Sequence, residues 1–286
     1  MWKKVHYQAH TEWLRWVTDT RMILLPAFFV FLYDALLRPL LEASYDMASP
    51  LHLLEPFIAL TNSQLIVLLM PCVFLALISD FPRMDGSSIL ALPRTGRRAW
   101  VLGQALFLFR CALLFLTSVL AASCLLCAHR SYWGAGWSRV TREYALVFPE
   151  RSGSLAANLI RSNLYYQLRT AEAALHSFLL LLLYFLFLGM ILLTLCLLRQ
   201  RRFGMVCAAG VLVAGQALTV FQTKSSWLFP AAHSIVQNHF TLLYSRPIVP
   251  LAVSYLYFGV GILVMLGLSL YLVKDFPYDA VMEATE

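Results

Sequence analysis

The residues of this sequence best suited to chemistry are charged side chains that separate two long apolar runs. They lie within residues 80–99: Asp80, Arg83, Asp85, Arg94, Arg97 and Arg98. The D-x4-D-G pattern at the start could begin a metal site, but such a site needs aspartates one and two turns later, and residues 89–97 contain none. The chain has no G-x-x-x-x-G-K-S/T phosphate loop and no H-E-x-x-H pair. We therefore expect no catalytic site, and any ATP used must be bound by another chain.

Cysteine and histidine spacings offer two further candidates for metal or redox chemistry. Cys124 and Cys127 form a C-x-x-C, but all six cysteines fall inside apolar runs or at their ends, which favours a packing role. His6 and His10 stand four residues apart and could share a metal on a helix. We expect them instead to be polar edge residues of an amphipathic helix, so no metal site is predicted.

Composition places the chain in the membrane. Of its 286 residues 60% are hydrophobic and 13% are charged, and the mean hydropathy is +0.71. Soluble domains are about half apolar and a quarter charged. The apolar residues are gathered in runs near the roughly 20 residues that cross a bilayer as a helix. The sequence predicts an all-α integral membrane protein, whose net charge of +7 is scattered among loops and does not indicate nucleic-acid binding.

Six spans are predicted, and none is preceded by a cleavable signal peptide, so the N-terminus is expected to be retained. The second span contains Pro71, which can kink a membrane helix. The third is longer than a bilayer requires and should tilt or project. The expected spans are residues 22–41, 57–79, 100–128, 171–198, 203–221 and 250–273.

An amphipathic helix is predicted over residues 2–20. One arc of about 120° contains its apolar residues, and the opposite side is polar. Tryptophans on the apolar face suit a helix that lies in the membrane interface, and a further tryptophan begins the third span. A cytosolic helix packed on a soluble partner is the alternative. The expected interface anchors are Trp2, Trp13, Trp16 and Trp100; the polar side comprises Lys3, Lys4, Gln8, Thr11, Glu12, Arg15 and Asp19.

Lysine and arginine residues set the predicted orientation. They concentrate near the amphipathic helix, in residues 80–99 and in the turn at residues 199–202, which places these segments and both termini in the cytoplasm. Residues 129–170 then form an external loop, although its six arginines conflict with the positive-inside rule. Residues 222–249 are expected to form short external or re-entrant helices.

Two charged residues fall inside the predicted spans. If Met22 and Trp100 mark the inner boundary, a rise of about 1.5 Å per residue places Asp34 and Arg110 at depths of about 18 and 15 Å. Charges within a membrane usually pair or line a wet cavity. Our hypothesis is that these two side chains face one another or both face a translocation path; the alternative is that each meets other polar groups separately.

The tail of the charged segment, LPRTGRRAWVLGQ at residues 92–104, resembles the coupling loop of ABC-2 type permeases, the membrane subunits of ABC exporters. In that family the loop also lies between the second and third spans and contains a small helix. Here Ser87 or Ser88 could cap such a helix, and Pro93 would end it. Asp85 departs from the pattern, because the family usually has a glutamate before the glycine.

The resemblance implies a single permease domain over residues 1–286, with an interfacial elbow helix at residues 1–21 and an ABC-2, type V exporter-like fold. Two such subunits, identical or different, would form the pathway in a bacterial cytoplasmic membrane. A separate ATPase subunit would bind ATP and Mg and would dock on the cytoplasmic coupling loop at residues 80–99. The expected docking residues are Arg83, Asp85, Gly86, Ile89, Leu90, Leu92, Pro93, Arg97 and Arg98.

The alternative function is an ATPase-independent secondary carrier, or a membrane partner protein. A carrier predicts internal repeats with broken, charged helices at the middle of the membrane. We find no convincing repeat between the two halves of the chain. The apolar, aromatic pathway is compatible with a peptide, a lipid-linked molecule, an antibiotic or an ion as substrate.

Overall fold

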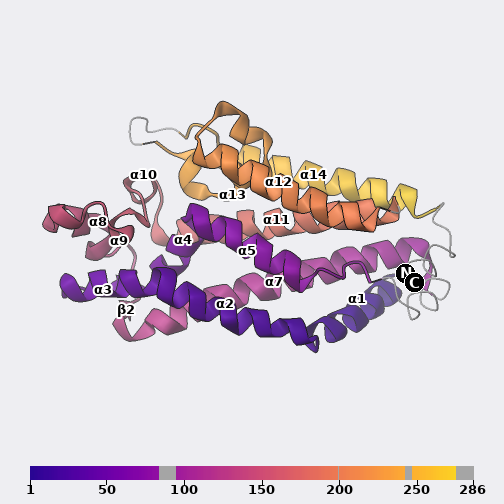
Figure 1. The fold of residues 1–286 in the computed structure, drawn as a ribbon, viewed down its shortest axis with the longest axis horizontal. Coiled ribbons are helices and arrows are strands. Elements are labelled where there is room, and N and C mark those ends of the chain that lie inside the picture. The colour runs from indigo at the N-terminus through magenta and orange to yellow at the C-terminus, as the bar shows by residue number, and fades with distance from the viewer. Residues whose placement is uncertain (84–94, 199, 242–246, 275–286) are drawn as a thin grey trace.

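The computed structural model of the protein describes residues 1–83, 95–198, 200–241 and 247–274, which form a helical bundle (Figure 1). Among these residues five helices are long and apolar enough to cross a membrane, and a bent pair of shorter helices makes a sixth if the pair is one span. The protein is thus an all-α membrane protein by the length and composition of its helices. The five are Thr20–Asp46, which includes α2 (Leu24–Leu32), a π-helical turn (Tyr33–Leu37) and α3 (Arg38–Asp46), then α7 (Arg97–Cys127), α11 (Thr170–Leu197), α12 (Arg201–Val220) and α14 (Leu251–Leu272).

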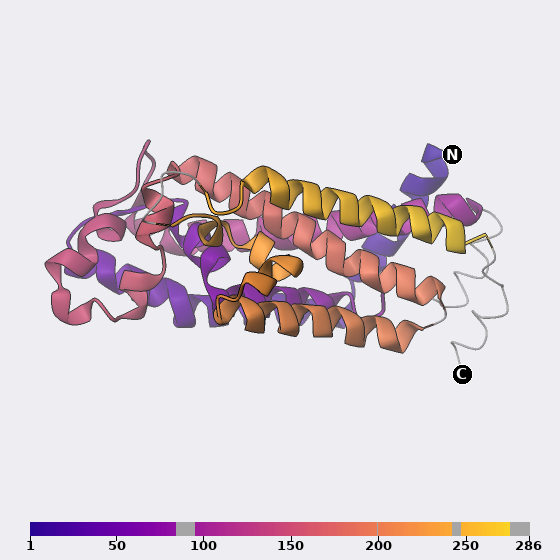
Figure 2. The same cartoon turned by 90° about the horizontal axis from the view of Figure 1, so that it is seen from above.

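The long helices lie side by side along the longest axis of the molecule, and Figures 1 and 2 agree on which ends meet. One end, here called the α1 end, holds α1 (Trp2–Val17), the start of α7 and the last residues of α11 and α14. The opposite end carries a small lobe built from the expected external loop. The lobe contains α8 (Arg139–Val147), α9 (Leu155–Asn158), α10 (Ser162–Tyr165) and a two-residue parallel pairing of β1 (Leu51–His52) with β2 (Ser131–Tyr132).

A buried carboxylate fastens this lobe to the bundle. Glu55 is fully buried, and its two oxygens accept hydrogen bonds from the backbone N–H groups of Ser138 at 2.6 Å and His52 at 3.1 Å. Because a buried carboxylate needs hydrogen-bond donors, the lobe and the start of the second span must fold together.

The centre of the bundle is α11. In the most apolar 18-residue stretch of α11, 61% of the residues are buried, against 11% in the corresponding stretch of α14. The α11 helix is therefore surrounded by protein, while α14 presents leucines and valines outward. Aromatic rings connect α11 to its neighbours: Phe185 stacks on Phe74 at 4.8 Å and meets Phe115 edge-on at 5.6 Å. Phe115 in turn stacks on Phe28 at 6.2 Å, which fixes how the first span lies along α7.

The residues expected to form the second span fold as two helices with a sharp bend between them, and the bend is not at the proline. The α4 helix (Glu55–Asn62) meets α5 (Gln64–Leu77) at an angle of 84°, with Ser63 in an extended conformation between them. The sequence offered Pro71 as a residue that can kink a span over residues 57–79, but Pro71 lies inside α5 and the sharp bend is at Ser63. The bend occurs where the side-chain amides of Gln216 and Gln237 donate to the backbone carbonyls on either side of Ser63.

The short helical segments expected in this part of the chain are present among residues 222–241. They include a 3-10 turn at Lys224–Leu228, α13 (Pro230–Ser234) and a second 3-10 turn at Val236–His239. The α13 helix packs against α11, α12 and α14 (Figure 2).

The predicted amphipathic helix is present as α1, but its buried face differs from the predicted one. Gln8 and Glu12, expected on the polar side, are buried against the first half of α7, where Gln8 donates to Glu12 at 3.1 Å. Gly103 of α7 makes this close approach possible, because a Cβ there would lie 2.9 Å from the Cβ of Gln8. The α1 helix is therefore packed into the protein as well as being amphipathic.

Two of the four expected interface anchors are core residues. Trp16 is 2% exposed and donates its indole N–H to the carbonyl of Leu77 at 2.9 Å, and Trp100 is 1% exposed. Trp16 is held by the contact of α1 with the end of α5, and Trp100 is buried near the start of α7; the sequence pattern revealed neither. Trp2 is exposed and Trp13 is half-buried, so these two remain available to the interface.

The close contact of α1 with α7 can be tested at Gly103. Gly103→Ala places a methyl group against the Gln8 side chain, and we expect it to lower the free energy of unfolding by about 1–3 kcal/mol, as overpacking does. Gly210→Ala is the matched control, because a Cβ at this helical glycine meets no atom within 4 Å. Thermal unfolding in detergent measures both; equal stability of the two variants would contradict the packing.

Candidate functional site

The expected docking loop is described only at its two flanks. Arg83 lies before the undescribed stretch, and Arg97 and Arg98 follow it at the start of α7. Gly96 immediately precedes α7 with a φ of +88°, a left-handed conformation that favours glycine. The other expected docking residues lie outside the described residues: Asp85, Gly86, Ile89, Leu90, Leu92 and Pro93.

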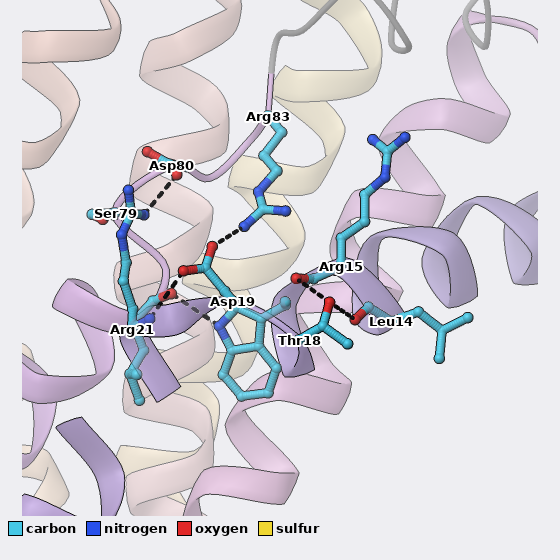
Figure 3. Close-up of polar contacts among 10 residues, drawn as sticks. Leu14, Arg15, Thr18, Asp19, Arg21, Ser79, Asp80 and Arg83 are labelled. Atoms are coloured by element: carbon cyan, nitrogen blue, oxygen red, sulfur yellow. Dashed lines mark hydrogen bonds and ion pairs between the residues drawn. The ribbon is translucent and has the colours of Figure 1, made fainter. Parts of the chain in front are cut away.

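Two ion pairs attach the first flank of this loop to the junction between α1 and the first span. Arg83 Nη2 lies 2.5 Å from Asp19 Oδ2, and Arg21 Nη1 lies 2.6 Å from Asp80 Oδ2 (Figure 3). We call these four residues the clasp. Each pair joins one residue from the junction to one from the segment that follows α5, so both ion pairs link the same two segments.

Hydrogen bonds within each segment hold the clasp residues in place. The backbone N–H of Arg21 donates to Asp19 Oδ1 at 3.0 Å, which caps the 3-10 turn that begins the first span. Arg21 also donates to the hydroxyl of Ser79 at 2.8 Å (Figure 3). The buried hydrogen bond from Trp16 to Leu77 supports the same junction from beneath.

The two ion pairs differ in exposure. The Asp19 and Arg83 side chains are 19% and 23% exposed, against 41% for Asp80 and 38% for Arg21, so the first pair is less screened by solvent. Hydrogen bonding from the Arg21 backbone, together with the positive charges of Arg21 and Arg83, outweighs burial and lowers the pKa of Asp19. Asp19 therefore stays ionised at neutral pH and the pair persists.

The clasp positions chain segments and offers no room for a substrate. The cavity beneath it measures about 10 Å³ and is lined by apolar residues such as Trp16 and Phe107 together with Glu12, Gln104 and the clasp residues Asp80 and Arg83. A space of this size accommodates at most one water molecule. The arrangement can transmit a displacement between the loop and the two helices it joins, and it contains no nucleophile with a positioned base.

The structure does not bring Asp34 and Arg110 together. Asp34 lies 3.3 Å from Arg38 one turn along its own helix, with its side chain 74% exposed, and Arg110 Nη2 lies 3.2 Å from Nδ1 of His6. The reason is the register of the first span against α7, which the contact of Phe28 with Phe115 fixes.

Both helices run from the α1 end toward the lobe, so the level of Phe28 on the first span corresponds to that of Phe115 on α7. Asp34 then lies level with a point about eleven residues beyond Arg110, a separation of roughly 16 Å along the axis. The hypothesis of direct pairing within one chain was wrong, because Met22 and Trp100 do not lie at the same level.

A buried histidine pair was missed by the sequence analysis. Ser254 Oγ of α14 lies 2.7 Å from Nδ1 of His233 and 2.7 Å from Nε2 of His239. The other nitrogens of the two rings face the carbonyls of Trp227 and Ile235, so in the neutral rings these nitrogens carry the hydrogens. Two histidines six residues apart in an aromatic segment were the available signal, but only folding places one serine between them.

Burial keeps this pair neutral. Loss of hydration lowers the pKa of His233 and lowers that of His239 to about 4. The serine hydroxyl has one hydrogen and serves only one of the two facing nitrogens at a time. A proton added to either ring would supply the missing donor, and it is the cost of burying the charge that opposes this at neutral pH.

Comparisons with protein-family models, with curated proteins and with solved structures found no match to this chain. Function is therefore inferred from the residues and geometry of the chain itself.

The clasp predicts a graded loss of stability. Asp19→Asn keeps the capping oxygen but removes the charge that Arg83 binds, and we expect a loss of about 1–2 kcal/mol, between the values of exposed and buried pairs. Asp80→Asn should cost less, because its pair is more exposed. Exchanging the charges, Asp19→Arg with Arg83→Asp, should restore part of the loss; wild-type melting temperatures for both single variants would exclude a stabilising clasp.

The histidine pair predicts that stability falls in mild acid. The unfolded ring protonates near pH 6.5 and the folded His239 only near pH 4, so the unfolded state binds more protons between these values and unfolding becomes easier as the pH drops. Across this pH range the free energy of unfolding should fall by about 3 kcal/mol in total. His239→Asn should flatten the pH dependence of the melting temperature between pH 7 and 4.5, and His129→Asn, at an exposed histidine, should leave it unchanged.

Proposed function

We propose that this protein is the membrane-spanning permease subunit of an ATP-driven exporter of the ABC-2 type, which forms the translocation pathway as a dimer and docks a separate ATPase through the loop after its second span. The observation that carries the proposal is the clasp. It fixes the beginning of that loop to the junction of α1 with the first span through the Asp19–Arg83 and Arg21–Asp80 pairs.

A docking loop can drive a transporter only if its displacement reaches the spans. The loop at residues 80–99 follows α5 closely, has the clasp residues Asp80 and Arg83 at its start, and runs into α7, which begins at Arg97. A force on the loop would therefore act on α1, α5 and α7 together, because α1 packs along α7 and bonds to the end of α5 through Trp16. Such common motion is what rigid coupling to an ATPase requires.

In this proposal the chain contributes no catalytic group. The ATPase subunit binds ATP and Mg, while the permease lies in a bacterial cytoplasmic membrane with both termini and the docking loop on the ATPase side. Arginines of the loop flanks, Arg83, Arg97 and Arg98, would set the register of docking through charge complementarity, and apolar loop residues would fill a groove on the ATPase.

Co-purification of an ATP-binding subunit tests the proposal. Leu92→Asp should abolish the association while leaving the permease inserted, because a carboxylate would have to be buried in an apolar groove. Leu146→Asp is the matched control, since Leu146 is 78% exposed on the lobe at the opposite end of the bundle. If no ATP-binding protein accompanies the wild type, or if Leu92→Asp retains it, the exporter assignment fails.

The broken second span supports a second candidate, an ATPase-independent secondary carrier. Carriers bind substrates and ions at discontinuous helices near the middle of the membrane, and the 84° break at Ser63 lies beside the polar side chains of Asn62 and Gln237. Transport by the purified protein in vesicles separates the two: a carrier works with an ion gradient and no ATPase, and the exporter subunit does not.

A further inference from the structure

An open groove runs between α1 and α7 on the outside of the bundle. Its volume is about 440 Å³, far larger than the cavity beneath the clasp. It is lined by His10 and Trp13 of α1 and by Arg110, Leu113, Leu114 and Thr117 of α7.

One end of the groove is positively charged. Arg110 contacts the ring of His6, and among the described residues no carboxylate pairs with it. Glu12, the carboxylate of α1, is buried on the other face of that helix, where Gln8 donates to it. The guanidinium at the head of the groove is therefore not neutralised by the part of the chain that the structure describes.

The rest of the groove is apolar. Leu113 and Leu114 are half-buried one turn along α7, and the hydroxyl of Thr117 donates to the carbonyl of Leu113 at 2.8 Å, so its hydrogen is already used. Trp13, stacked on His10 at 6.2 Å, forms the opposite wall. Along α7 the groove thus changes from charged to apolar within two turns.

The sequence of α7 places this change at the end of a charge-free run that is long enough to cross a membrane. Residues 111–128 contain no charged side chain, and 18 helical residues span about 27 Å, close to the roughly 30 Å hydrocarbon core. Arg110 precedes this run, and His129 and Arg130 follow it. The level of Arg110 also matches the start of the first span, near Ile23, by the register of Phe28 against Phe115. Arg110 therefore marks the end of this charge-free run that lies toward the α1 end of the bundle.

We propose that this groove binds an anionic phospholipid, with the phosphate on the Arg110 guanidinium and an acyl chain along Leu113, Leu114 and Thr117. A guanidinium presents a planar fork of donors that fits phosphate oxygens, and tryptophan suits the boundary between headgroup and chain. The lipid joins α1 to α7 from the outside of the bundle, about two turns further along α7 than the close contact of Gln8 with Gly103. The site does not depend on the docking of an ATPase.

Thermal unfolding of the full chain in neutral detergent micelles tests the site. Phosphatidylglycerol should raise the melting temperature more than phosphatidylcholine does, by a difference on the order of 3 °C. Arg110→Gln should abolish this difference. Lys224→Gln, which removes an exposed positive charge far from the groove, should preserve it.

Two further measurements keep the result decisive. Thr117→Trp fills the apolar part of the groove and keeps Arg110, so it should also abolish the preference, even if Arg110→Gln fails to fold. Native mass spectrometry should find a retained anionic lipid on the wild type and on Lys224→Gln but not on Thr117→Trp. Equal effects of the two lipids, or an equal shift with inorganic phosphate alone, would overturn the proposal. A Thr117→Trp variant that changes its oligomeric state but keeps the lipid preference would also overturn it.

Discussion

The break in the second span at Ser63 is the constraint on which the rest of the bundle depends. Backbone groups beside a break inside a membrane bundle need partners from the protein. The amide of Gln237 donates to the carbonyl of Asn62 at 2.6 Å, and the amide of Gln216 donates to that of Gln64 at 2.6 Å. Asn62 itself accepts from the Gln237 backbone at 3.0 Å and donates to Ser177 at 3.1 Å. These bonds fix α12, α11 and the segment before α14 around one point.

The α5 helix connects this polar junction to the clasp. It begins at Gln64, beside the break, and ends at Leu77, just before Asp80 and Arg83. Its second half is held by the stacking of Phe74 on Phe185 of the central helix. In the exporter that we propose, α5 is the element through which a displacement of the docking loop would reach the break, because it is bonded at both ends and packed between them.

The α1 helix has a different task on each side. Its buried face packs on α7, its C-terminal end leads into the clasp, and its outer edge forms one wall of the lipid groove. Polar residues therefore serve α1 in two ways: Gln8 donates to Glu12 inside the contact, while His10 lines the groove and His6 contacts Arg110. The α1 helix is packed against the protein on one side and open to the membrane interface on another. The apolar and polar arcs predicted from the sequence therefore describe it only in part.

The sequence by itself determined the positions of most helices, because the length of an apolar run and a 3.6-residue period are local properties that any fold of this chain must respect. It also located the charged interruption whose first flank forms the clasp, while the docking role of residues 80–99 stays a prediction. Only the tertiary structure decided the bend at Ser63, the burial of Trp16 and Trp100, the different levels of Asp34 and Arg110, and the meeting of His233 with His239 at Ser254. Each of these depends on partners far away in the sequence, and no local pattern records which remote side chain will satisfy a given polar group or fill a given contact.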